Sequence, residues 1–206
     1  MTDSDSLSNR GAGEPSSSLL HRVRECNQAA WERLVSLYSP LVYYWCRQCQ
    51  LQPADAADVG QQVFLAIARQ VHDYRPDPTG GSFRAWLRTL TRYAVNDHLR
   101  TIQIRGVGGV NGDLVEQPSE AAGKELAESS GEAEQTEQSL LFHRAMNLMQ
   151  AEFEERTWLA FWHVVVDGRS PADVAQDLGM TRNAVYLAHA RVLLRLREEF
   201  GDLVDM

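Results

Sequence analysis

The chain has 206 residues and a formal net charge of -8, with 44% hydrophobic and 23% charged residues. This composition is ordinary for a soluble globular protein and excludes a wholly disordered chain. No apolar run approaches the roughly 18 residues that span a bilayer. Residues 1–18 are polar and lack the apolar centre of a secretory signal, so we expect a cytoplasmic protein without membrane insertion.

The charge is unevenly distributed along the chain. Residues 22–105 contain 11 arginines against seven acidic residues, whereas residues 106–139 contain one lysine against eight acidic residues. Of the 20 basic residues, 19 are arginine, whose planar guanidinium matches phosphates and base edges. The first of these segments is therefore suited to nucleic acid although the whole chain is acidic.

The first half of the chain predicts an extension followed by a helical domain. Residues 1–20 are rich in Ser, Gly and acidic residues and predict a disordered extension. Residues 21–105 predict the domain. Apolar residues recur within it at spacings of three and four over residues 31–49, and Pro40 predicts the start of a new helix there.

Two more helices are predicted in this domain, over about residues 54–74 and 83–105, with a loop rich in Pro and Gly over residues 75–82. Residues 106–139 contain too few apolar residues for a core and predict a flexible acidic linker. This linker is either a solvated tether or an electrostatic mimic of nucleic acid.

Residues 140–203 predict a second helical domain. A dense apolar helix over residues 158–166 is followed by Ser170, which predicts a capped helix over residues 171–178. Thr181 predicts the cap of a last helix that runs to about residue 200. The predicted fold is all-α, with two small helical domains joined by the linker.

The stretch from Ala172 to Val185 has the pattern of a helix-turn-helix, with Gly179 where the chain must turn tightly. The second helix would present Arg182, Asn183 and Tyr186 to base edges in the major groove. The alternative is a plain helical hairpin.

A cationic stripe runs along the helix predicted over residues 83–105. Arg84, Arg88 and Arg92 repeat every four residues, interleaved with aromatic rings such as Tyr93. Arginines and rings together suit single-stranded DNA, because rings stack on unpaired bases while arginines hold the backbone. The alternative is an aromatic core with arginines on its surface.

Three stretches carry a family resemblance: Asp55-Ala-Ala-Asp-Val-Gly-Gln-Gln-Val-Phe-Leu65, Gly81-Ser-Phe-Arg-Ala-Trp-Leu87 and Tyr93-Ala-Val-Asn-Asp-His-Leu-Arg100. Followed by a linker and the helix-turn-helix, they resemble the extracytoplasmic-function (ECF) sigma factors, the minimal two-domain class of bacterial transcription initiation factors. Residues 183–197 are similar to members of planctomycete type. The resemblance implies a σ2-like bundle and a σ4-like domain. It also implies a protein that binds core RNA polymerase, directs it to specific promoters and helps melt the minus-ten element.

The resemblance also implies roles for particular residues. Those expected to dock on the clamp helices of the polymerase β′ subunit are Asp58, Gln61, Gln62 and Phe64. Those expected at the minus-ten element are Arg84, Arg88, Arg92, Tyr93 and Asn96. Those expected at the minus-thirty-five element are Thr181, Arg182, Asn183, Tyr186 and Arg191. The helix over residues 158–166 lies where a contact with the β flap is expected, and an anti-sigma factor is a further partner.

Two other functions fit less of the sequence. A stand-alone helix-turn-helix regulator with an N-terminal sensing or dimerisation domain explains residues 140–200 but leaves the arginine stripe unexplained. An enzyme is disfavoured because His98, His163 and His189 fall on three different predicted helices, outside any nucleophile-elbow or metalloprotease motif. We therefore expect no catalytic residue, no cofactor and no metal, and a monomer when the protein is free.

The three cysteines argue against a disulfide scaffold. Cys46 and Cys49 are spaced as in a redox motif, but the strand–helix context of that motif is missing. We interpret them as small apolar side chains one helical turn apart.

Overall fold

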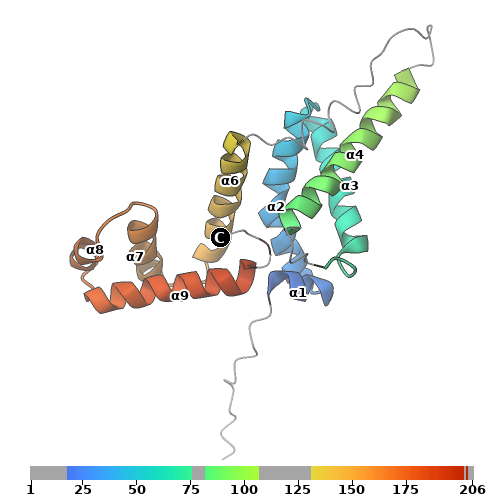
Figure 1. Cartoon of the computed structure of the whole chain (residues 1–206). Helices are drawn as coiled ribbons and strands as arrows, with labels where there is room; N and C mark the ends of the chain where they lie inside the picture. Colours follow the sequence, from blue (N-terminus) through green and yellow to red (C-terminus); the bar gives the residue numbers. More distant parts are fainter. Residues whose placement is uncertain (1–17, 76–81, 107–130, 202, 204–206) are drawn as a thin grey trace, which may run out of the picture.

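The computed structural model describes residues 18–75, 82–106, 131–201 and 203, and these residues form helices without any strand (Figure 1). In chain order the helices are α1 (Leu19–Arg24), α2 (Gln28–Gln48), α3 (Pro53–Gln70), α4 (Phe83–Gly106), α6 (Gly131–Gln150), α7 (Glu155–Val165), α8 (Pro171–Asp177) and α9 (Arg182–Phe200). The all-α prediction is confirmed. The predicted extension up to residue 17, the centre of the loop at 76–81 and the linker over 107–130 lie outside the described residues.

Helices α1 to α4 form the N-terminal bundle. Helix α2 packs against α1, α3 and α4, and α3 also packs against α4. The buried face of α3 includes Val59, Val63 and Ile67, whose spacing of four places them on one side of a helix. The predicted apolar periodicity of this helix is therefore confirmed.

Helices α7, α8 and α9 form the C-terminal domain. Ser170 caps α8 by accepting the Asp173 N–H at 3.2 Å, as the capping pattern predicts. The chain then turns at Gly179, whose φ of +58° is a conformation that glycine adopts without strain. Thr181 caps α9 by accepting the Ala184 N–H at 3.1 Å. The predicted helix-turn-helix is therefore present.

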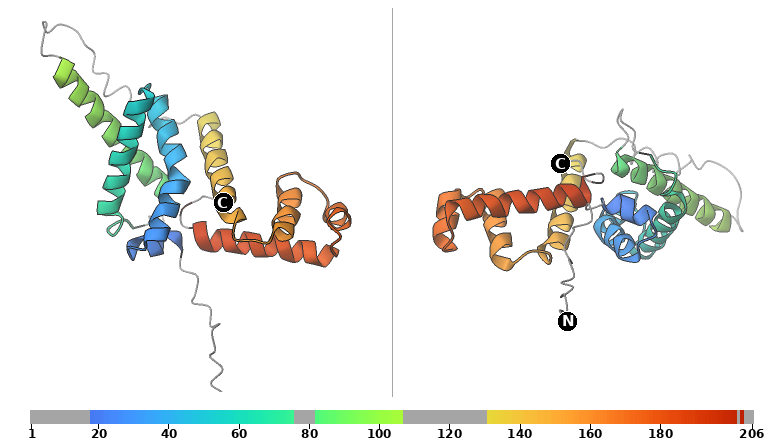
Figure 2. Two further views of the ribbon diagram at one scale, coloured as in Figure 1. Left: turned by 180° about the vertical axis from the view of Figure 1, so that it is seen from behind. Right: turned by 90° about the horizontal axis from the view of Figure 1, so that it is seen from below.

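Helix α6 connects the bundle and the C-terminal domain, and it differs from the sequence prediction. It begins at Gly131, inside the segment expected to be a flexible linker. Its buried residues Leu141, Ala145 and Met149 form one face, which packs mainly on α2 and also touches α9 (Figures 1 and 2). One continuous apolar core therefore runs from α1 through α6 to α9.

Helix α2 continues through Pro40, where the sequence predicted the start of a new helix. Proline has no N–H, so the Ser36 carbonyl loses its partner in the helix. Arg144 of α6 supplies one instead, since its Nε donates to that carbonyl at 2.6 Å and its Nη2 donates to Ser36 Oγ at 2.7 Å. A contact from more than 100 residues away thus supports the unbroken helix.

The predicted N-terminal extension ends earlier than expected. Helix α1 begins at Leu19, and the side chains of Leu19 and Leu20 are fully buried in the core. Leu19 and Leu20 are two adjacent apolar residues that follow a polar stretch, and this pattern could have predicted where the extension ends. In the part of the chain that the structure describes, the helices are too short or too polar to cross a membrane.

Candidate functional site: two arginine-bearing helices and an apolar groove

The N-terminal end of α9 is exposed, as a DNA-reading helix requires. Thr181, Arg182 and Asn183 are all exposed, and the Tyr186 side chain one turn later is 58% exposed. Arg191 is exposed as well, but it lies about two and a half turns beyond Arg182. The structure thus brings four of the five predicted residues together at one end of the helix.

Sequence reasoning missed Arg156, which supports the turn before α9. This arginine lies on α7, and its Nη2 donates to the Leu178 carbonyl at 2.5 Å and to the Gly179 carbonyl. Both carbonyls belong to the chain between α8 and α9, so Arg156 ties α7 to the turn that precedes α9. Its sequence position alone gives no signal of this role.

The stripe of arginines on α4 is only partly accessible. Arg84 Nη2 lies 3.2 Å from Glu134, and Arg88 pairs with Glu137 of the same helix α6. Glu137 is 2% exposed and also accepts the Trp45 Nε1–H at 2.8 Å. The Arg84 and Arg88 side chains are only 13% and 22% exposed. Two carboxylates therefore cover both arginines in this conformation, and their predicted contact with minus-ten DNA stays a prediction.

The next turn of α4 is open. The Tyr93 side chain is 63% exposed, and the Arg92 guanidinium lies 5.6 Å from the centre of its ring. Asn96 is half-buried, and its Oδ1 has no hydrogen-bond partner among the residues the structure describes. Trp86, by contrast, packs against Tyr74 at a ring distance of 4.8 Å and against the core. An exposed ring, an arginine and an unsatisfied amide therefore share one face of α4.

An apolar groove of about 750 Å³ lies between α2 and α3. Its lining includes Trp31, Val35 and Tyr43 from α2 and Gln61, Phe64 and Leu65 from α3. The Leu65 side chain is 57% exposed, while Phe64 is half-buried with its ring edge-on to Trp31 at 6.4 Å.

Two of the four predicted docking residues line this groove, and the other two lie outside its lining. Asp58 and Gln62 are exposed on α3, and Gln61 and Phe64 line the groove itself. The α2 side of the groove was missed, because its apolar periodicity alone does not reveal which of its residues stay uncovered. An exposed apolar hollow edged by polar residues is a typical protein-docking surface.

The two neighbouring cysteines are inert core residues. Cys46 and Cys49 are buried free thiols, and burial raises the pKa of Cys46 to about 12, with a smaller contribution from Cys49. A thiol with this pKa stays protonated at neutral pH and is a poor nucleophile or metal ligand. This supports the interpretation of both residues as apolar side chains.

Comparison with known proteins found one matching family model and one similar curated protein. The model for Sigma-70 region 2 matches residues 34–103, which cover most of α2, all of α3 and nearly all of α4. A curated relative, the ECF RNA polymerase sigma factor ShbA of Streptomyces griseus, is 29% identical over 188 residues, covering 87% of this chain and 92% of the relative. The chain contains a Sigma-70 region 2 and is similar over most of its length to an ECF RNA polymerase sigma factor. Both findings support a sigma factor that directs RNA polymerase to promoters.

One solved structure was also similar, a chain of the RsbN-BldN complex, with 19% identity, coverage of 86% of this chain and 96% of that chain, and a TM-score of 0.36. A TM-score this low does not establish a shared arrangement. The region 2 match covers the part of the chain that a stand-alone helix-turn-helix regulator leaves unexplained. The similarity to planctomycete members stays a prediction, as do the predicted domain boundaries.

Proposed function

We propose that this sigma factor binds polymerase through the α2–α3 groove, the minus-ten element through α4 and the minus-thirty-five element through the start of α9. The observation that carries the proposal is the groove. All of its lining except Trp31 falls in the region matched by the family model, and α3 contributes Gln61 and Phe64, two of the docking residues named from the sequence. An uncovered apolar groove of this kind suits a helical partner, which the β′ clamp helices would supply.

The open turn of α4 is suited to an unpaired base. Tyr93 offers an exposed ring for stacking, which contributes about 1–3 kcal/mol per base. The Asn96 amide could donate to a base edge, and its carbonyl oxygen, which is buried and unpaired in this structure, could accept from one after the side chain turns outward. Duplex DNA hides these base faces and edges, so such a surface favours the melted strand over the closed duplex.

The start of α9 is suited to duplex DNA. A recognition helix places its first residues against base edges, and Arg182 can donate two hydrogen bonds to a guanine. Arg191 lies beyond that end of the helix and is placed for a phosphate. Val165 and Val166, exposed at the end of α7, support the expected β-flap contact.

The remaining expectations belong to the same proposal. The protein acts in the cytoplasm as a monomer when free, without enzymatic activity, cofactor or metal of its own. An anti-sigma factor is a further partner, for which the exposed groove offers a surface.

The polymerase arm is tested by changing two exposed residues of α3 together, with Asp58→Arg and Gln61→Ala, of which Gln61 lines the groove. Reversing a charge at a close interface contact costs on the order of 2–5 kcal/mol, so co-elution with core polymerase should be lost while the circular dichroism spectrum stays helical. The matched control is Asp73→Arg with Gln70→Ala, an exposed pair of the same residue types beyond the groove, which should bind normally. Equal co-elution of the groove variant and the control would remove the groove from the docking surface.

A further inference from the structure

The solvent-facing side of α9 carries a line of apolar side chains that the proposed function leaves unexplained. This apolar line begins one turn after Asn183 and consists of Leu187, Ala190 and Leu194, all of them exposed. The spacings of four, three and four residues place these side chains on one face of the helix. The Leu187 and Leu194 side chains are 51% and 57% exposed. A contiguous exposed apolar surface of this kind marks a site of interaction.

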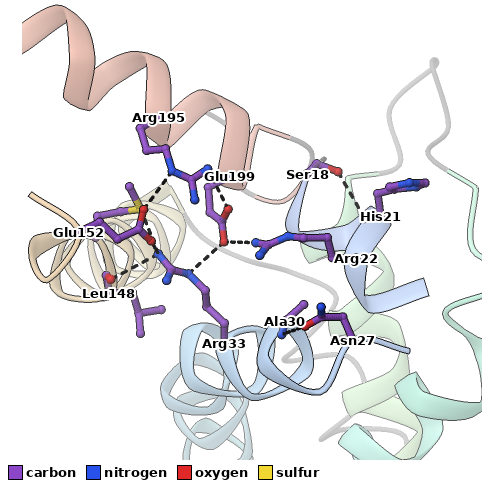
Figure 3. A network of polar contacts seen from close by, with 11 residues as sticks. Ser18, His21, Arg22, Asn27, Ala30, Arg33, Leu148, Glu152, Arg195 and Glu199 are labelled. Atoms are coloured by element: carbon purple, nitrogen blue, oxygen red, sulfur yellow. Dashed lines mark hydrogen bonds and ion pairs between the residues drawn. The ribbon is translucent and has the colours of Figure 1, made fainter. Parts of the chain in front are cut away.

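The opposite side of α9 is buried along the whole helix. Its buried residues are Val185, Ala188, Val192, Leu196, Glu199 and Phe200. Near the far end of the helix, Glu199 forms ion pairs with Arg22 of α1 and Arg33 of α2 (Figure 3). Because these contacts hold α9 in one rotation about its axis, the apolar line faces away from the rest of the protein.

The charge around the apolar line favours duplex DNA as its partner. The sequence from Thr181 to Arg197 contains no acidic residue, although the chain as a whole has a net charge of -8. Arg182 and Arg191 are exposed on the two flanks of the line. A cationic border without carboxylates attracts phosphates. Helix α9 is also the second helix of the helix-turn-helix, the one that enters the major groove in proteins built this way.

The major groove offers an apolar side chain one distinctive target. Thymine carries a C5-methyl group there, whereas the other three bases present hydrogen-bond donors and acceptors. An apolar side chain at the base edges therefore distinguishes thymine from the other bases. Leu187 lies one turn beyond Asn183, about 6 Å along the helix axis, which is roughly the rise of two base pairs. It is thus placed to meet a base close to the one that Asn183 meets.

We propose that Leu187 reads the C5-methyl group of a thymine in the minus-thirty-five element. The inference rests on the proposed function, since it assumes that the start of α9 lies in the major groove. It adds a base to the element, because Arg182 suits a guanine and Asn183 an adenine, while Leu187 selects a thymine. The preference arises because the leucine side chain and the methyl group leave water together when the helix docks.

A selection experiment identifies the thymine. Holoenzyme, assembled from core polymerase and the full-length chain, selects duplexes from a randomised DNA library. The unchanged protein should enrich a thymine at one fixed position near the bases that depend on Arg182, and Leu187→Ala should enrich the same element with any base at that position. The matched control is Leu194→Ala, the same change at an equally exposed position of the apolar line. Leu194 lies beside Glu152 and Glu198, whose carboxylates disfavour DNA there, so this variant should enrich the thymine normally.

Deleting the methyl group from the DNA tests the contact itself. Deoxyuridine pairs as thymidine does and differs from it only by the missing methyl group. Placing deoxyuridine at the selected position should weaken holoenzyme binding about fourfold, which corresponds to the roughly 0.8 kcal/mol of one buried apolar carbon. With Leu187→Ala the two duplexes should bind equally, and with Leu194→Ala the fourfold ratio should remain. A general defect in α9 would weaken binding to both duplexes alike, so the ratio isolates the contact.

The outcomes separate this inference from the function on which it rests. Suppose that the selected upstream element depends on Arg182, but that deoxyuridine has no effect at any of its thymines or the same effect with both alanine variants. The role of Leu187 is then overturned and the proposed function stands. If Leu187→Ala instead reduces co-elution with core polymerase, the apolar line contacts protein and the inference is wrong. If the unchanged protein enriches no upstream element, α9 reads no bases, and the inference fails together with that part of the proposed function.

Discussion

Helix α4 and helix α9 carry the same kind of signal, an arginine near the start of an amphipathic helix, but the fold treats them differently. Arg182 of α9 is exposed beside Asn183 and Tyr186. Arg84 and Arg88 of α4 are largely covered by carboxylates of α6. The difference arises from a neighbour in space, because α6 packs on the bundle and leaves the start of α9 free. A DNA-binding pattern in a sequence therefore predicts the chemistry of a surface without predicting its accessibility.

The largest expected effect comes from breaking the contact that holds α9 to the bundle. Glu199→Ala leaves Arg22 and Arg33 without their buried partner, and removing one member of a buried ion pair costs about 3–5 kcal/mol. Urea unfolding followed by circular dichroism should show a loss of this size.

The neighbouring Glu198→Ala is the control for this loss. Glu198 is only half-buried, so its removal should change stability by no more than about 0.5 kcal/mol. If the two alanine variants unfold at the same urea concentration, the Glu199 network does not hold the domains together. The contrast between the covered arginines of α4 and the exposed start of α9 would then not be a stable property of the fold.

A smaller effect should separate base reading from phosphate contact at the exposed helix. Arg182→Ala should reduce discrimination between promoter and scrambled DNA by ~1–3 kcal/mol if the side chain makes a bidentate contact with a base. Footprinting of the polymerase complex over the minus-thirty-five region measures this loss. Arg197→Ala, an exposed arginine near the far end of α9, should leave discrimination unchanged. An equal loss on promoter and scrambled DNA would show that Arg182 contacts only phosphate.

The smallest effect concerns how the reading end of α9 is held. Thr181→Ala removes the oxygen that accepts the Ala184 N–H, and the loss of such a cap costs about 1 kcal/mol. A thermal melt should detect a modest decrease in midpoint. Thr136→Ala in α6 is the control, since its hydroxyl donates only to a carbonyl of its own helix. Equal midpoints for the two variants would mean that α9 begins stably without its cap.

Local features of the fold were readable from the sequence. The caps Ser170 and Thr181, the turn at Gly179 and the buried spacing of Val59 and Val63 each depend on residues a few positions apart. Interactions between residues this close in sequence can be predicted from the order of the residues. For this reason the helix-turn-helix and α3 were predicted within a few residues of their ends.

Features that depend on distant partners were not readable. Helix α2 continues through Pro40 because Arg144 donates a hydrogen bond to the Ser36 carbonyl. Arg88 is covered because it pairs with Glu137, which lies 49 residues further along the chain. The glutamates of α6 looked like solvated linker residues, since an acidic run gives no indication of which member is buried. The groove lies between two helices, and the residue pattern of one helix does not show which helix packs beside it. The sequence therefore predicted only the α3 side of the groove.

The central claim is that the open turn of α4 holds the melted promoter strand, and permanganate reactivity of unpaired thymines in the polymerase complex tests it most directly. Arg92→Ala together with Tyr93→Ala removes the exposed ring and its arginine, and leaves the groove residues on the other helices untouched. We expect normal binding to core polymerase, no thymine reactivity on linear promoter DNA, and partial recovery of transcription on a template with a pre-opened minus-ten bubble. If the double variant opens linear promoter DNA as fast as the unchanged protein, α4 does not hold the melted strand and the account is contradicted.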